Sequence, residues 1–83
     1  MSGNAFVDHY RKLVVFWSPE CACTVVASWF ENGVLSTNPF LKNIRSKKSI
    51  NSRKWLVDNG YLYNYIQAWH LIKEFNYYSV YFT

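Results

Sequence analysis

The chain has 83 residues, enough for one small domain, and its 51% apolar and 20% aromatic content excludes an intrinsically disordered segment. Its formal net charge of +4 favours anionic partners in general but identifies none of them. Two cysteines are too few for a disulfide framework and the apolar runs are too short to cross a membrane, so we expect a soluble, cytoplasmic protein.

The first predicted element is a strand. Residues 1–4 are expected to be frayed, and residues 6–11 to form either a helical turn or an entry loop. Residues 12–17 (Lys-Leu-Val-Val-Phe-Trp) are a continuous β-branched and aromatic run, typical of a strand that is buried on both faces. Pro19 cannot donate a hydrogen bond to a neighbouring strand, so the strand should end before it.

A helix is predicted directly after this strand. Thr24 is the expected N-cap, and the pair Asn32-Gly33 is the expected stop, because both residues accept the left-handed conformation of a C-terminal cap. Helical spacing also predicts the buried face of this helix, which comprises Val26, Ala27, Phe30 and Val34.

The middle of the chain is predicted to be mostly irregular. Residues 36–39 should form a loop, and residues 40–44 another turn of helix. Residues 45–54 are basic and rich in Ser and Asn, which favours an exposed loop. The Asp-Asn-Gly sequence at residues 58–60 indicates a tight turn.

The last third predicts an amphipathic helix and a second strand. Apolar residues recur at three- and four-residue steps in a helix that should end near Asn76. The predicted apolar face comprises Leu62, Tyr65, Ile66, Trp69 and Ile72. Residues 78–82 (Tyr-Ser-Val-Tyr-Phe) are a β-type run. This order of elements favours an α/β fold in which strands 12–17 and 78–82 are parallel and flanked by helices.

The connection between the first strand and the first helix has the composition of an anion-binding loop. Residues 18–24 (Ser-Pro-Glu-Cys-Ala-Cys-Thr) are mostly small or carry hydroxyl groups. A strand that passes into a helix through such a loop aims backbone N–H groups and the positive end of the helix dipole at one point. The pattern therefore predicts a site for a phosphate-like anion, although the charge of Glu20 opposes it.

The same residues resemble a known family. Residues 16–24 (Phe-Trp-Ser-Pro-Glu-Cys-Ala-Cys-Thr) are similar to the 5′-phosphosulfate-binding loop of sulfotransferases, and residues 78–83 to the strand that leads into that family's 3′-phosphate-binding motif. The resemblance implies an incomplete three-layer P-loop-like unit: a single, truncated sulfotransferase-like domain over residues 1–83. It implies 3′-phosphoadenosine-5′-phosphosulfate as the cofactor and sulfate donor, with no metal. The residues that it assigns to the cofactor are Pro19, Glu20, Cys21, Ala22, Cys23, Thr24 and Val25.

Two residues depart from the pattern of the family. Glu20 stands where the family has a Lys that stabilises the charge developing on the leaving sulfate, and Val25 replaces the usual Ser. At an effective dielectric constant near 20, a charge about 4 Å away is worth roughly 4 kcal/mol, and reversing its sign changes the interaction by about twice that. We therefore expect weak donor binding and no catalysis by this chain alone. The ancestral reaction is sulfuryl transfer to an unknown hydroxyl or amine acceptor.

Three other side chains have both a chemical and a structural interpretation. His70 lies one helical turn before Glu74 and is a candidate base for the acceptor, although a half-buried helix histidine is the commoner case. Cys21 and Cys23 lack the second pair of ligands that a structural zinc site needs, which favours packing over metal binding. No metal site is therefore predicted.

The alternative function is a small basic, aromatic-rich binding module without catalysis, for a protein or a nucleic acid. Six cationic residues that could bind an anionic partner are concentrated in one stretch of the chain: Lys42, Arg45, Lys47, Lys48, Arg53 and Lys54. A solvated loop explains this cluster more simply, because only Trp55 adjoins it as a stacking aromatic, so nucleic acid is the less favoured partner. Exposed sheet edges favour self-association.

Overall fold

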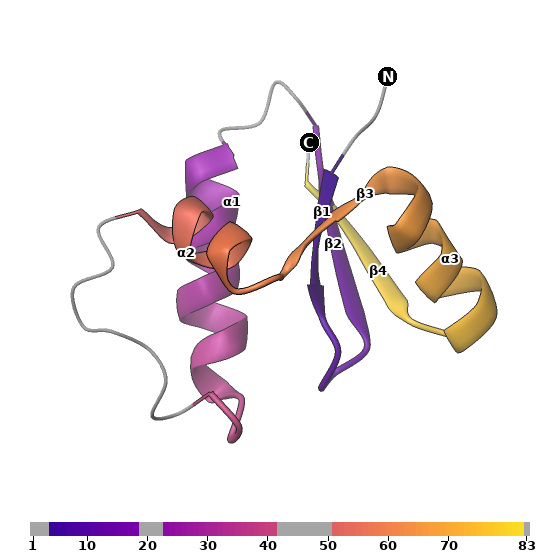
Figure 1. The fold of residues 1–83 in the computed structure, drawn as a ribbon, viewed down its shortest axis with the longest axis horizontal. Helices are drawn as coiled ribbons and strands as arrows, with labels where there is room; N and C mark the ends of the chain where they lie inside the picture. The colour runs from indigo at the N-terminus through magenta and orange to yellow at the C-terminus, as the bar shows by residue number, and fades with distance from the viewer. Residues whose placement is uncertain (1–3, 19–22, 42–50, 83) are drawn as a thin grey trace.

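The computed structural model describes residues 4–18, 23–41 and 51–82. A central sheet has α1 and α2 on one side and α3 on the other, so the chain forms three layers (Figure 1). The elements in chain order are β1 (Asn4–Asp8), β2 (Leu13–Trp17), α1 (Cys23–Trp29), a π-helical turn (Phe30–Val34), a 3-10 turn (Leu35–Thr37), α2 (Ser52–Asp58), β3 (Leu62–Asn64), α3 (Tyr65–Phe75) and β4 (Tyr78–Phe82). The predicted α/β class is confirmed.

The sheet has four strands in the order β3-β1-β2-β4 and is mixed. β2 and β4 are parallel, as the sequence predicts, and in their register Val15 lies opposite Val80. β1 is antiparallel to both β2 and β3. The prediction of a helical turn or loop over residues 6–11 is therefore wrong for residues 6–8. Only three consecutive apolar residues mark β1, too short a run to show a period, and its burial between two other strands decides its conformation.

The β1–β2 turn is anchored to the far end of the first helix. The Asp8 carboxylate is buried; it accepts hydrogen bonds from the Tyr10 backbone N–H at 3.0 Å and from Arg11 Nη1 at 2.8 Å. Arg11 Nη1 also donates to the Val34 carbonyl at 3.0 Å, and Nη2 donates to the Thr37 hydroxyl. A buried carboxylate needs such partners, so this network holds the hairpin against the end of the helix.

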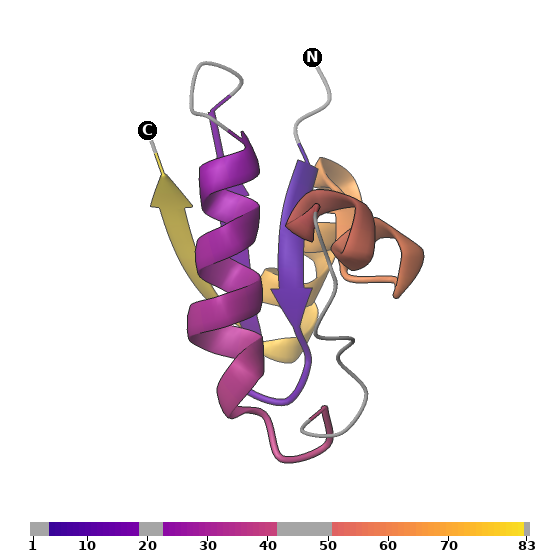
Figure 2. The ribbon, with the colours of Figure 1, turned by 90° about the vertical axis from the view of Figure 1, so that its left-hand side faces the viewer.

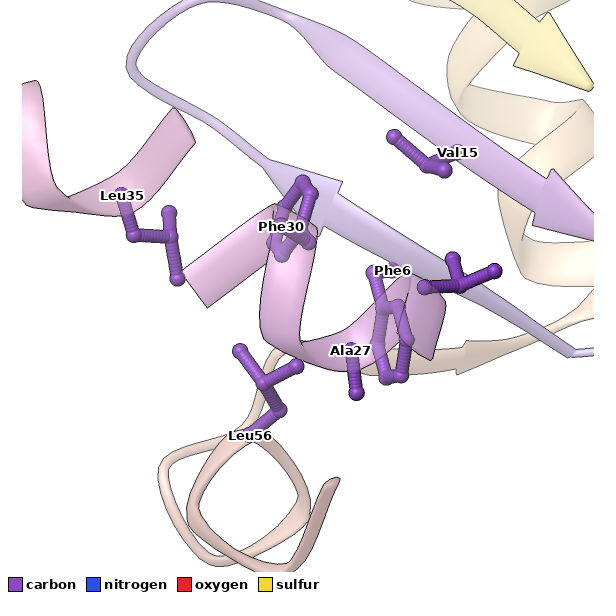
Figure 3. Close-up of a cluster of buried hydrophobic side chains, with 7 residues drawn as sticks. Phe6, Val15, Ala27, Phe30, Leu35 and Leu56 are labelled. Carbon is purple, nitrogen blue, oxygen red and sulfur yellow. The ribbon is translucent and has the colours of Figure 1, made fainter. Parts of the chain in front are cut away.

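The core on the α1 side of the sheet combines residues from four parts of the chain. It comprises Phe6, Val15, Val26, Ala27, Phe30, Leu35 and Leu56, most of them labelled in Figure 3. The Phe6 ring stacks on Phe30 at 5.6 Å between centroids and on Trp17 at 4.3 Å. The predicted buried face of the first helix is thus confirmed, with Val34 half-buried at its end.

The sequence predicts that the first helix stops at Asn32-Gly33, and this prediction is wrong. The helix continues through the π-helical turn and the 3-10 turn as far as Thr37. Leu35 is 3% exposed in the core, and Arg11 binds the carbonyl of Val34, so tertiary contacts override the local stop signal. Residues 36 and 37 consequently belong to the 3-10 turn and not to the predicted loop.

α2 begins inside the stretch that the sequence assigns to an exposed loop. Residues 45–50 lie outside the described residues, but residues 52–54 form the first turn of α2, so the prediction is wrong there. Asn51 caps this turn by accepting a hydrogen bond from the Lys54 N–H at 3.1 Å. Leu56 is fully buried against α1, and this contact fixes the short helix. Gly60, with φ +81°, forms the predicted turn after it.

α3 begins three residues later than predicted. Leu62 belongs to β3, and Asn64 caps the helix in a capping box: its side chain accepts from the Gln67 N–H at 2.8 Å, while the Gln67 side chain accepts from the Asn64 N–H at 3.3 Å. The helix ends at Phe75, with Asn76 as a left-handed cap at φ +59°, so the predicted end is confirmed.

The predicted apolar face of α3 is correct in part: Tyr65 and Trp69 pack on the Phe16 ring of β2, and Ile72 also packs on this side of the sheet. Ala68 is fully buried and Leu71 and Ile72 pack beside it, whereas Ile66 is 80% exposed. The contact with the sheet is therefore centred on Ala68, which is not among the residues of the predicted face.

A buried valine of β2 and an exposed valine of α1 allow a matched test of the core. Val15→Ala should lower the free energy of unfolding by about 2 kcal/mol, because two fully buried methyl groups are lost and a cavity is left. Val25→Ala, at a side chain that is 66% exposed on α1, should change it by about 0.5 kcal/mol or less. Urea unfolding followed by circular dichroism measures both. Equal losses in the two variants would contradict the fold.

Candidate functional site

The candidate site lies where the parallel strands end. Trp17 in β2 is opposite Phe82 in β4, and the Ser18 N–H donates to the Phe82 carbonyl at 3.0 Å, so both strands finish at the same edge. α1 starts beyond this edge at Cys23 and runs back along the sheet (Figure 2). Strand ends and a helix start are thereby brought together, which is the usual position for ligands in open α/β sheets.

The predicted loop residues fall partly outside the described part of the chain. Residues 19–22, which are Pro19, Glu20, Cys21 and Ala22, lie outside it. Cys23 is half-buried and packs against the α1-side core, so the interpretation of this thiol as a packing residue is supported. Thr24 and Val25 are both exposed in the first turn of α1. The prediction of Thr24 as N-cap is wrong, because α1 begins one residue before it.

A shallow hollow extends from the first turn of α1 along the outer face of the helix. Its volume is about 610 Å³, and it is lined by Thr24, Val25, Ser28, Trp29, Asn32 and Gly33. The Trp29 ring meets the Phe82 ring edge-on at 4.8 Å, which joins the hollow to the edge strand β4. These lining side chains carry no formal charge, so at this part of the site any anion would be held by dipoles and hydroxyl groups.

The basic cluster is only partly described. Lys42, Arg45, Lys47 and Lys48 lie outside the described residues. Arg53 and Lys54 are in the first turn of α2, where Lys54 Nζ pairs with the Asp58 carboxylate at 2.6 Å. The role of the cluster in binding stays a prediction.

His70 lies away from the strand ends. It is exposed on α3, on the opposite face of the sheet from α1, and its ring meets Phe75 edge-on at 5.6 Å (Figure 1). Glu74 is also exposed, in the last turn of the same helix. The described residues therefore do not bring His70 together with Thr24, and its role as a base stays a prediction.

The structure contains a cluster of three ring side chains that the sequence does not predict. His9, in the β1–β2 turn, is hydrogen-bonded through Nδ1 to the Tyr77 hydroxyl at 2.7 Å and through Nε2 to the Tyr63 hydroxyl at 2.6 Å. A neutral imidazole has one donor and one acceptor nitrogen, so one phenol accepts and the other donates in either tautomer. The three residues are far apart in sequence, and no local pattern connects them.

Tyr77, a member of this cluster, and Tyr61 both have raised pKa values. Burial raises the pKa of Tyr77 above its ordinary value, and the charges of Tyr63 and Asp8 raise it further. Burial, followed by the charge of Asp8, also raises the pKa of Tyr61. Both shifts favour the neutral phenol, and the neutral Tyr77 phenol is hydrogen-bonded to His9 Nδ1.

Comparisons with known proteins give no relative: no family model matches the chain, and neither a curated protein nor a solved structure matches it. Within residues 4–18, 23–41 and 51–82, no three His, Cys, Asp or Glu side chains gather as metal ligands. In that same part of the chain, every helix is too short or too polar to span a bilayer.

The raised phenol pKa values predict how stability depends on pH. The folded state holds the Tyr77 and Tyr61 protons more tightly than the unfolded state, so their contribution is complete below about pH 10 and is lost as the pH rises through the folded pKa values. The urea midpoint should therefore fall above about pH 10. The double variant Tyr61→Phe/Tyr77→Phe should show a shallower fall. An equally steep fall in this variant would contradict the assignment.

Proposed function

We propose that this chain is a sulfotransferase-like unit whose β2–α1 connection binds the 5′-phosphosulfate of 3′-phosphoadenosine-5′-phosphosulfate weakly. One observation carries the proposal. β2 and β4 are parallel and end side by side, with Ser18 hydrogen-bonded to Phe82, and α1 starts from the same edge. Residues 16–24, which resemble the donor loop of that family, run in sequence from the end of β2 to the start of α1.

The proposed contacts follow from the chemistry of an anionic group at a helix start. Backbone N–H groups from Cys21 to Val25 would donate to the phosphosulfate oxygens, and the Thr24 hydroxyl would add a further hydrogen bond. The exposure of Thr24 leaves its side chain accessible to a ligand. In the family that the chain resembles, the 3′-phosphate is held by residues that follow the neighbouring strand, which corresponds here to β4.

Glu20 sets the limit of the proposed activity. A carboxylate in place of the family's Lys repels both the bound donor and the charge that develops as the sulfuryl group leaves. Weak binding without transfer is therefore the function proposed for this chain alone. The reaction class of a complete site would be sulfuryl transfer from the donor to a hydroxyl or amine.

A charge reversal at Glu20 tests the proposal. Glu20→Lys should raise the affinity for 3′-phosphoadenosine-5′-phosphosulfate by at least about tenfold in isothermal titration calorimetry at low salt, because a repulsive charge becomes attractive. Glu74→Lys is the matched control, since it makes the same change of net charge at an exposed position on α3, across the sheet from α1. It should change the affinity by less than about threefold.

Two results would count against the proposal. Equal and negligible affinity in wild type and Glu20→Lys would mean that the connection does not bind the donor. An equal gain in Glu20→Lys and Glu74→Lys would mean that the donor responds only to net charge. Separately, measurable sulfuryl transfer by the unmodified chain would contradict the inactivity assigned to Glu20.

A further inference from the structure

β4 is an edge strand whose two sides differ in hydrogen bonding. Its neighbour within the described sheet is β2 alone. The Tyr78 N–H donates to the Lys12 carbonyl at 2.7 Å, and the Phe82 carbonyl accepts from Ser18 at 3.0 Å. Backbone groups of a parallel strand alternate in direction, so residues 78, 80 and 82 face β2. Ser79 and Tyr81 consequently direct their N–H and C=O groups away from β2, toward the open edge.

Within residues 78–82, the sequence has none of the residue types that usually prevent strand pairing. Its five residues, Tyr-Ser-Val-Tyr-Phe, include no charge, no proline and no glycine. Tyr78 is 73% exposed and Tyr81 is 59% exposed. The opposite edge strand, β3, has only three residues and passes directly into α3, so it is protected by its shortness.

We propose that β4 pairs with β4 of a second copy of this chain, antiparallel and centred on Val80. In this register Ser79 lies opposite Tyr81 of the second copy, and their outward N–H and C=O groups form a hydrogen-bonded pair on each side of the two-fold axis. Val80 then lies opposite Val80, and Tyr78 opposite Phe82. The two four-stranded sheets become one continuous sheet.

The side chains of β4 are complementary to themselves in this register. On the α3 side the small Ser79 lies opposite the large Tyr81, and on the α1 side the two valines lie opposite one another between aromatic pairs. No like charges meet across the axis, because β4 is uncharged. A strand of unrelated sequence would match the backbone but not this alternation of sizes, and for that reason a second copy is the inferred occupant.

Exposed rings beside β4 extend the contact on both faces of the sheet. On the α1 side, Trp29 is 41% exposed and its ring touches Phe82. On the α3 side, the ring centroids of Tyr81 and Phe16 are 6.1 Å apart. The Phe16 ring also stacks on Trp69, which is 36% exposed. Pairing of two copies would bury part of this aromatic surface, which adds an apolar contribution to that of the backbone hydrogen bonds. The inference does not depend on donor binding.

Charge placement at the axis tests the register. Sedimentation velocity of the whole chain should give a mass twice that of the monomer at high concentration. Val80→Lys and Val80→Glu should each be folded monomers, because position 80 meets itself and like charges repel. An equimolar mixture of the two should recover the doubled mass. Ile66→Lys, at an apolar side chain that is 80% exposed on α3, is the control and should keep it.

A monomeric wild type at millimolar concentration would overturn the inference. So would a doubled mass that persists unchanged in folded Val80→Lys, or one that Ile66→Lys abolishes while Val80→Lys does not. If the charged variants fail to fold, amide exchange in the wild type decides. Exchange at Ser79 and Tyr81 should slow at least tenfold between dilute and concentrated protein. Concentration-independent exchange at both amides would equally overturn the inference.

Discussion

The parallel hydrogen bonding between β2 and β4 is the constraint on which the rest of this structure depends. Parallel neighbours cannot be joined by a tight turn, so the chain between them must leave the sheet and return. It does so through α1 on one face and α3 on the other, which produces the three layers seen in Figure 1. The same pairing brings the ends of both strands to one edge. The proposed donor site and the open strand edge therefore have one origin.

The sequence predicts the parts of the fold whose signals are local and strong. The β-branched and aromatic runs at residues 12–17 and 78–82 become β2 and β4, with Lys12 left in the preceding turn at φ +53°. The helical spacing of Val26, Ala27 and Phe30 identifies the buried face of α1 correctly. Each of these signals is carried by residues that are close together in the chain.

The features of the fold that the sequence does not predict depend on contacts between residues far apart in the chain. β1 is a strand because it lies between two others, and the first helix continues past Gly33 because Leu35 is buried and Arg11 binds the Val34 carbonyl. α3 packs through Ala68, which carries little apolar weight in a periodicity count. In each case packing overrides a local preference that pointed elsewhere.

The candidate site also has parts that the sequence predicts and parts that it does not. The donor-loop resemblance is contiguous, so sequence alone predicts it, and Glu20 is recognised there as a departure. The neighbouring strand end at Phe82 is distant in sequence but becomes predictable once β4 is recognised as parallel to β2. The cluster of His9 with Tyr63 and Tyr77 cannot be predicted in this stepwise way. Its three residues come from the β1–β2 turn, β3 and the segment before β4, and the positions of all three segments would have to be known first.

Backbone NOEs between β2 and β4 are the most direct test of this account. An isotope-labelled sample should show cross-strand contacts in the parallel register that pairs Val15 with Val80, together with a protected Ser18 amide. Contacts in an antiparallel register, or none between the two strands, would contradict the account. The candidate donor site and the open edge would both be lost with that pairing.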